Sequence, residues 1–91
     1  MKNGKLENGF EYEIDDSNLD DMEFLELFAN VAKGKDPWGL FDVIGQLFPG
    51  EAKKKLYNFC RDPKTKKVSP EKVGDLIGKV IEDAREDGKN S

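Results

Sequence analysis

The 91 residues of this chain can form one small domain with a modest core, because 36% of them are hydrophobic and nine are aromatic. The chain has no histidine, so it cannot form a Ser-His-Asp or Cys-His catalytic site. Its one cysteine, Cys60, cannot form an internal disulfide, and one cysteine without histidine makes a zinc site unfavourable. It also has no glycine-rich phosphate-binding motif, so we expect no enzyme activity, no cofactor and no metal site.

Charge is distributed unevenly along the chain, whose formal net charge is −4. Residues 1–30 hold two Lys and nine Asp/Glu, whereas residues 51–72 hold eight Lys/Arg and three Asp/Glu. Surfaces of opposite sign suit a protein that meets other proteins at more than one place, and the acidic surplus disfavours a general nucleic-acid binder. The single Cys60 points to a reducing compartment such as a cytosol. No apolar run is long enough to span a bilayer and no signal peptide opens the chain, so we expect no membrane contact.

Residues 5–14 are predicted to form a β arm, either a short hairpin or a lone strand. Asn8-Gly9 favours a two-residue type I′ turn. Phe10, Tyr12 and Ile14 alternate with glutamates, so their three apolar side chains share one face of the second strand.

The acidic stretch IDDSNLDDMEFLELF, residues 14–28, allows three interpretations. A calcium-binding loop that starts at Asp16 would need glycine at position 21 and a glutamate at position 27, where the chain has Asp and Leu. Acid–base chemistry would need a cation to separate the pKa values of two carboxyl groups, and residues 11–30 contain no Lys, Arg or His.

A helix start is the interpretation that fits the acidic stretch best. Ser17 or Asn18 can cap a helix over residues 17–33, acidic residues in its first turns suit the helix dipole, and Gly34 can end it. The apolar residues that recur at helical spacing are Met22, Leu25, Phe28, Ala29 and Ala32.

Three further helices are predicted over residues 37–48, 50–61 and 70–87. Asp36-Pro37 and Ser69-Pro70 are cap-plus-proline starts, and Pro49-Gly50 and Pro63 are stops. The apolar stripes are Trp38, Phe41, Ile44, Leu47 and Phe48, with Leu40 beside them; Ala52, Leu56, Phe59 and Cys60; and Val73, Leu76, Ile77, Val80, Ile81 and Ala84. The chain is therefore predicted to be one mainly α domain over residues 1–91, a compact bundle of four short helices with a small N-terminal β-strand or hairpin and a flexible tail at 88–91.

The candidate partner-binding residues are Trp38, Phe41, Phe48 and Tyr57. Trp38 is the only tryptophan and lies at a helix start, where it either enters the core or anchors a partner. The basic stretch 53–67 interleaves lysines with Tyr57 and Phe59, a pattern that can stack nucleic-acid bases but is also typical of a solvated helix face or a protein contact.

Three segments together resemble the tail assembly chaperones of long-tailed, siphovirus-type bacteriophages and prophages of Gram-positive bacteria. They are LENGFEYEIDDSNLDDMEFLELF, LFPGEAKKKLYNFCRD and VSPEKVGDLIGKVIED, so the resemblance covers residues 6–86. The loop before the last helix departs from the family, because it is a long basic DPKTKKVS where an acidic, glycine-containing turn is usual.

The resemblance implies a chaperone of virion assembly with no catalytic role. Members of the family bind the tape measure protein, keep it soluble and help to recruit tail tube (major tail) subunits, in the cytoplasm of the bacterial host and not in the mature virion. Self-association is left open. A small nucleic-acid-binding or regulatory module, or a structural tail component, is the alternative.

In this family a ribosomal frameshift near the end of the gene often makes a minority longer form. Lys89-Asn90 can encode the required heptamer, A AAA AAY, if Gly88 is encoded by GGA, Lys89 by AAA and Asn90 by AAC or AAT. A slip at this site would leave every predicted helix intact.

Overall fold

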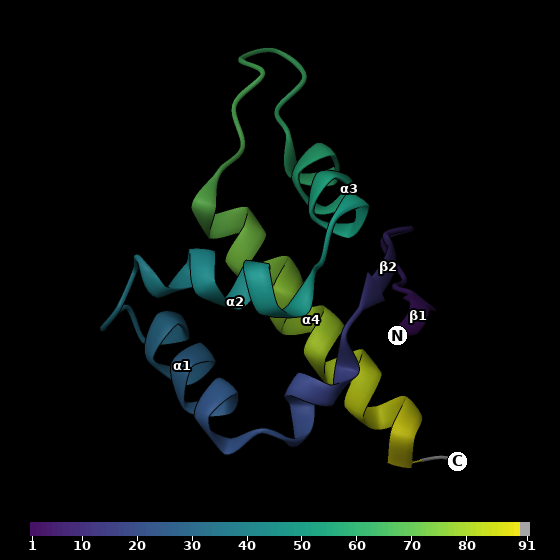
Figure 1. Cartoon of the computed structure of the whole chain (residues 1–91). Helices are drawn as coiled ribbons and strands as arrows, with labels where there is room; N and C mark the ends of the chain where they lie inside the picture. Colours follow the sequence, from purple (N-terminus) through teal and green to yellow (C-terminus); the bar gives the residue numbers. More distant parts are fainter. Residues whose placement is uncertain (90–91) are drawn as a thin grey trace.

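The computed structural model describes the backbone of residues 1–89 and the side chains of residues 1–86. This part of the chain is mainly helical, with a two-stranded antiparallel hairpin followed by four α-helices, as the pattern of apolar residues predicts (Figure 1). The elements in chain order are β1 (Lys2–Lys5), β2 (Glu11–Ile14), the 3-10 helix η1 (Asp16–Asp20), α1 (Met22–Ala32), α2 (Gly39–Leu47), α3 (Glu51–Cys60) and α4 (Pro70–Lys89).

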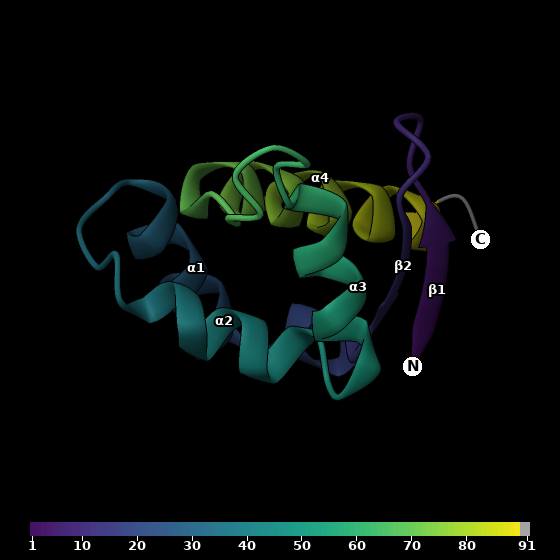
Figure 2. The ribbon, with the colours of Figure 1, turned by 90° about the horizontal axis from the view of Figure 1, so that it is seen from above.

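The helices and the hairpin surround one core. Seen from above, α4 and α2 lie on opposite sides, α3 lies between them toward one end, and the hairpin lies beyond α3 at that end (Figure 2). β2 contacts α3, β1 contacts α4, and α1 contacts α2. The buried core residues are Phe10, Tyr12, Ile14, Phe24, Val43, Ile44, Leu47, Phe48, Ala52, Leu56, Cys60, Val73, Leu76, Ile77, Val80, Ile81 and Ala84.

The hairpin confirms the predicted apolar face, since Phe10, Tyr12 and Ile14 are all buried. Its first strand begins at Lys2, earlier than predicted. The predicted type I′ turn is wrong, because only Gly9 in the turn has a positive φ, of 93°, and the Leu6 and Gly9 amides donate to the Phe10 and Leu6 carbonyl oxygens. The loop therefore has three residues and ends in a left-handed glycine, the second common hairpin geometry.

The helix predicted over residues 17–33 is divided in two. The Asp15 carboxylate accepts hydrogen bonds from the Ser17 amide and hydroxyl and caps η1, whereas extended Asp21 caps α1 by accepting from the Glu23 amide. The prediction of Ser17 or Asn18 as the cap is wrong, because the Asn18 side chain donates instead to the carbonyl oxygens of Asp15 and Gln46.

The predicted apolar stripe of α1 is wrong for Met22, Ala29 and Ala32, which do not pack on the core. Phe24 is the buried residue of this helix. The half-buried residues that pack on the core are Leu25, Leu27, Phe28 and Val31. Met22 is 78% exposed. Nearly every position of α1 is apolar, so two neighbouring stripes have helical spacing, and packing against the rest of the core decides which one is buried.

The other three helices lie within two residues of their predicted bounds. In α2, Gly39, Val43, Ile44 and Leu47 face inward and Trp38 and Phe41 do not, which corrects the predicted stripe. In α3 the inward prediction fails for Phe59, which is 46% exposed and packs its ring 5.0 Å from that of Phe10.

The predicted face of α4 is confirmed at all six positions, and the Ser69 hydroxyl caps the helix by accepting from the Lys72 amide. α4 continues to Lys89, past the predicted end at residue 87. Residues 90–91 of the predicted tail, and with them Asn90 of the frameshift site, lie outside the described residues. A search of the described residues finds no helix that has both the length and the apolar character to cross a membrane.

Candidate functional site

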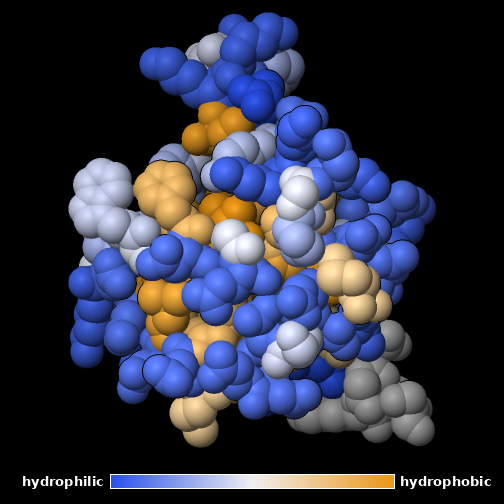
Figure 3. Space-filling view, viewed as in Figure 1, coloured by the Kyte–Doolittle hydropathy of each residue, from blue (hydrophilic) through white to orange (hydrophobic). Residues whose placement is uncertain are grey.

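Two aromatic side chains project into solvent at the start of α2, Trp38 from the cap position and Phe41 from the first turn. Trp38 is 77% exposed and Phe41 is 61% exposed. Their rings are stacked, with the centroids 6.4 Å apart and the planes at 16°. A stacked pair at this separation is a favourable arrangement, so the two rings form one continuous apolar surface. Figure 3 shows apolar side chains gathered on the α1–α2 side of this face of the molecule, among charged ones.

The start of α2 is held so that the aromatic pair points outward. The Asp36 carboxylate accepts a hydrogen bond of 3.1 Å from the Gly39 amide. The predicted start at Pro37 is wrong, because α2 begins at Gly39 and Trp38 occupies the cap position without a side-chain capping bond, but Asp36 does hold the first residue of the helix. Gly39 is buried, and a Cβ at this position would meet the Asp36 carboxylate and the Leu27 side chain of α1. Because α1 approaches α2 closely at Gly39, the neighbouring Trp38 and Phe41 must face away from the core.

The four candidate partner-binding residues do not form one surface. Phe48 is only 1% exposed and belongs to the core, so its assignment to a binding surface is wrong for the folded protein. Tyr57 is half-buried on α3, with the Lys53 ammonium group 5.6 Å from its ring centre. Among the described residues no ring contact joins Tyr57 to Trp38 or Phe41. The structure therefore brings together only Trp38 and Phe41.

The basic stretch 53–67 ends in a projecting loop that holds its own shape (Figure 1). The Asp62 carboxylate accepts hydrogen bonds from the Lys64 and Thr65 amides, which lowers its pKa. Arg61 donates to the Lys66 carbonyl oxygen over 2.7 Å, so one of the cations that could contact a phosphate is already engaged within the loop.

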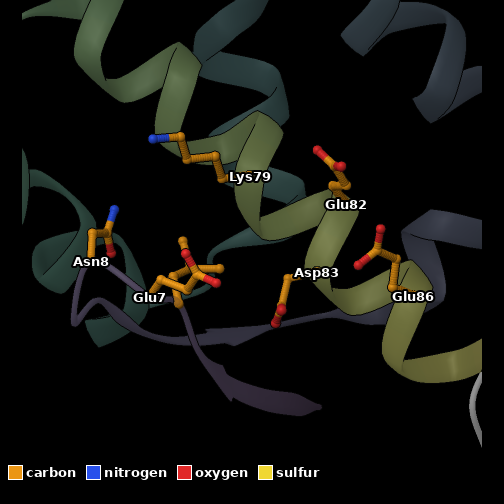
Figure 4. A pocket seen from close by; sticks show the side chains of 7 residues that line it. Glu7, Asn8, Lys79, Glu82, Asp83 and Glu86 are labelled. Carbon is orange, nitrogen blue, oxygen red and sulfur yellow. The ribbon is translucent and has the colours of Figure 1, made fainter.

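An open trough lies between the tip of the hairpin and α4 (Figure 4). Its lining is mostly acidic, with Glu7 on the hairpin side and Glu82, Asp83 and Glu86 along α4. Asp83 accepts a hydrogen bond of 2.7 Å from the Tyr12 hydroxyl, so this carboxylate helps to attach the hairpin to α4. The described residues contain no group of three His, Cys, Asp or Glu side chains placed to hold a metal ion.

A second hollow, of 310 Å³, lies beside the first, where the end of α3 meets α4. Phe59, Cys60 and Leu76 supply apolar lining, and Lys72 is among its charged residues. Burial raises the pKa of the Cys60 thiol, and the charge of Lys72 opposes that shift. Cys60 is therefore protonated at neutral pH and behaves as a small core hydrophobe, as the sequence suggests.

Gly45 is a surface feature of α2 that the pattern of apolar residues does not single out. It is exposed, and a Cβ built on it would have no other atom within 4 Å. Its spacing of seven residues from Trp38 and four from Phe41 places all three on one side of α2. That spacing is visible in the sequence, but whether the three residues face solvent or the core depends on which face of α2 is buried.

Comparisons of the chain with family models, curated proteins and solved structures found no match. Fold and site together define a small, mainly helical domain with an exposed aromatic pair. Its function is therefore inferred from that surface, from the distribution of charge and from the resemblance of its sequence segments.

Proposed function

We propose that this protein is a tail assembly chaperone that binds the tape measure protein of a long-tailed phage or prophage. The observation that supports a protein-binding role most directly is the stacked pair Trp38–Phe41, exposed to solvent at the start of α2. The resemblance of residues 6–86 to these chaperones supplies the family and the partner. Trp38 and Phe41 are the residues proposed to contact it.

The physical reason for this assignment is the cost of leaving large apolar side chains in water. Tryptophan is enriched among the residues that contribute most to binding at protein interfaces, and a pre-stacked pair loses little conformational freedom on binding. A long helical tape measure chain exposes apolar faces until the tail tube encloses it. A small domain that covers such faces would keep the chain soluble, and its charged exterior would allow later release to tail tube subunits.

Co-expression tests this proposal. A fragment of the tape measure protein encoded near this gene should give a higher soluble yield when it is expressed with the wild-type protein, and Trp38→Ala should reduce that gain. Because Trp38 is mostly exposed, the substitution should change the free energy of unfolding by no more than about 0.5 kcal/mol. Glu71→Ala is the control, since Glu71 is exposed in the first turn of α4, outside α1 and α2, and should leave the gain unchanged.

Other outcomes would favour the alternatives. No gain in soluble yield with the wild-type protein would remove the main support for a chaperone. Salt-dependent DNA binding that is lost when lysines in residues 53–67 are replaced would indicate a nucleic-acid module. Assembly of the protein alone into tubes or rings would indicate a structural tail component. Gene order is a further test, since a major tail protein gene upstream and a very long tape measure gene downstream are expected.

A further inference from the structure

The exposed side of α2 combines two bulky side chains with a gap. Trp38 projects from the cap position of α2 and Phe41 from its first turn, and Gly45 follows one turn after Phe41 on the same side. Nothing lies within 4 Å of the position that a Gly45 side chain would occupy. A glycine at such a position allows the backbone of a second helix to approach closely, beside the bulky pair that it would cover.

The charged side chains of α2 itself and of the hollow beside it are acidic. Asp42 is exposed between Phe41 and Gly45, and no described residue forms a hydrogen bond or ion pair with its carboxylate. Beyond Gly45, an open hollow of 340 Å³ lies between α1 and α2. Its lining residues are Asp21, Glu23, Phe24, Leu27 and Gln46. The segment Gly39–Leu47 contains no Lys or Arg, and the lysines that precede it in the chain, Lys33 and Lys35, lie in the connection between α1 and α2.

We propose that this face of α2 docks a basic amphipathic helix of the partner. The apolar side of that helix covers Trp38 and Phe41 and passes closely over Gly45. Its Lys or Arg side chains lie toward Asp42 and toward Asp21 and Glu23 in the hollow. This inference rests on the proposed function, because it specifies the contact surface and the chemistry of the bound segment. Laying an amphipathic helix against an apolar surface is a common mode of peptide recognition.

Charge argues against a second copy of this chain as the occupant. A two-fold pairing that places the aromatic pair of one α2 against Gly45 of the other has its centre near residue 42. The Asp42 carboxylates of the two copies would then face each other, and like charges at an interface are unfavourable. A partner helix with a cation at this point removes the conflict.

Filling the gap at Gly45 is the first test. Gly45→Gln adds a polar side chain where space is open, so circular dichroism should show a folded protein with an unchanged or higher melting temperature. Its dissociation constant for the tape measure fragment, measured by calorimetry, should rise about tenfold or more. Gly74→Gln on α4 is the matched control, because a Cβ at Gly74 also has nothing within 4 Å and this residue lies outside the proposed face.

Charge reversal is the second test. Asp42→Lys should weaken binding of the same fragment about tenfold, and the loss should shrink at high salt, where charge interactions are screened. Asp75→Lys on α4 makes the same change in net charge away from this face and should bind as the wild-type protein does. A synthetic helix from the bound segment with its Lys and Arg replaced by Glu should recover affinity for Asp42→Lys.

The outcomes separate the two proposals. If the wild-type protein does not bind the fragment, the proposed function fails and this inference fails with it. If the wild-type protein binds and Gly45→Gln and Asp42→Lys bind equally well, the chaperone role stands and the docking face on α2 is wrong. A concentration-dependent dimer in sedimentation experiments that Gly45→Gln abolishes would assign this face to a second copy and would overturn the inference in the same way.

Discussion

Tyr12 links the N-terminal hairpin to the last helix. Its side chain is 3% exposed, and its hydroxyl donates a 2.7 Å hydrogen bond to the Asp83 carboxylate on α4. Gly4 lies directly opposite Tyr12 in the register of β1 and β2. The Tyr12 ring covers Gly4 so closely that any Cβ at position 4 would overlap the ring. A glycine is therefore required in β1 for steric reasons, although its backbone is ordinary strand.

Gly4→Ala is expected to destabilise the protein by about 1–3 kcal/mol, the usual cost of an overpacked site. The added methyl group must displace the Tyr12 ring and with it the hydrogen bond to Asp83. A loss of this size corresponds to roughly 4–24 °C in the melting temperature of a domain of this length.

Gly74→Ala is the control for this substitution, because the same methyl group enters open space in α4. Replacing a helical glycine there should raise stability by up to about 1 kcal/mol. Thermal and urea unfolding measure both variants. A Gly4→Ala protein that melts at or above the wild-type temperature would contradict the close packing of Tyr12 on β1.

The connection between α3 and α4 is an ordered element of its own. An antiparallel bridge joins Arg61 to Val68, and the Asp62 amide donates to the Lys67 carbonyl oxygen. Lys66 has a φ of 65°, a left-handed conformation that few non-glycine residues adopt. The loop is therefore closed by backbone and carboxylate hydrogen bonds, in spite of its basic composition.

The stability of this loop should depend on pH through Asp62. Hydrogen bonds from the Lys64 and Thr65 amides hold the pKa of its carboxyl group below the ordinary value of 3.8. Between its pKa in the folded state and 3.8, Asp62 binds a proton more readily in the unfolded chain than in the folded one. The ionised Asp62 carboxylate therefore stabilises the fold fully above pH 3.8, and this stabilisation is lost as pH falls through the pKa of the folded state.

Asp62→Asn tests this dependence. At pH values above 3.8 the variant should unfold more readily than the wild-type protein, and the difference should narrow as pH falls. Lys64→Ala is the control, since it removes a loop charge but keeps the amide that donates to Asp62, and it should retain the wild-type pH dependence. Denaturant unfolding at several pH values measures all three proteins. A constant difference between wild type and Asp62→Asn across this range would exclude the carboxylate as the cause.

On the scale of the whole molecule, the two charge blocks of the sequence fall on different parts of the fold. The acidic N-terminal third forms the hairpin, η1 and α1, and the basic block forms α3, the projecting loop and the start of α4 (Figure 1). Both surfaces flank a core to which the hairpin, η1 and all four helices contribute. The last buried residue of that core among the described side chains is Ala84.

A longer form made by frameshift at Lys89-Asn90 would therefore keep the core unchanged. A slip at Lys54-Lys55 or Lys66-Lys67 would instead remove part of α3 or all of α4, with their buried residues. The gene sequence is the measurement: the codons of Gly88, Lys89 and Asn90 should read GGA, AAA and AAC or AAT. A different Gly88 codon, or no open −1 frame after Ser91, would exclude the mechanism at this site.

The sequence by itself determined the elements whose apolar and polar positions are clearly separated. In α4 the charged residues alternate with six apolar ones at helical spacing, so only one face can be buried, and Ser69-Pro70 marks its start. In β2 the glutamates between Phe10, Tyr12 and Ile14 leave one apolar face. The sequence also singled out Trp38 and Phe41 as candidate contacts, by residue type and by their place at a helix start.

Only the tertiary structure decided which faces of α1 and α2 turn inward. Both helices have apolar residues on adjacent stripes, so the period alone allows two orientations for each. The close approach of Leu27 to Gly39 selects one of them. With that crossing, Phe24 belongs to the same buried core as Val43 and Phe48, and Trp38 and Phe41 remain in solvent. The contact between Leu27 and Gly39 sets the rotation of α2 about its own axis, and this rotation exposes the aromatic pair. Local periodicity does not encode that contact, because its two residues lie on different helices.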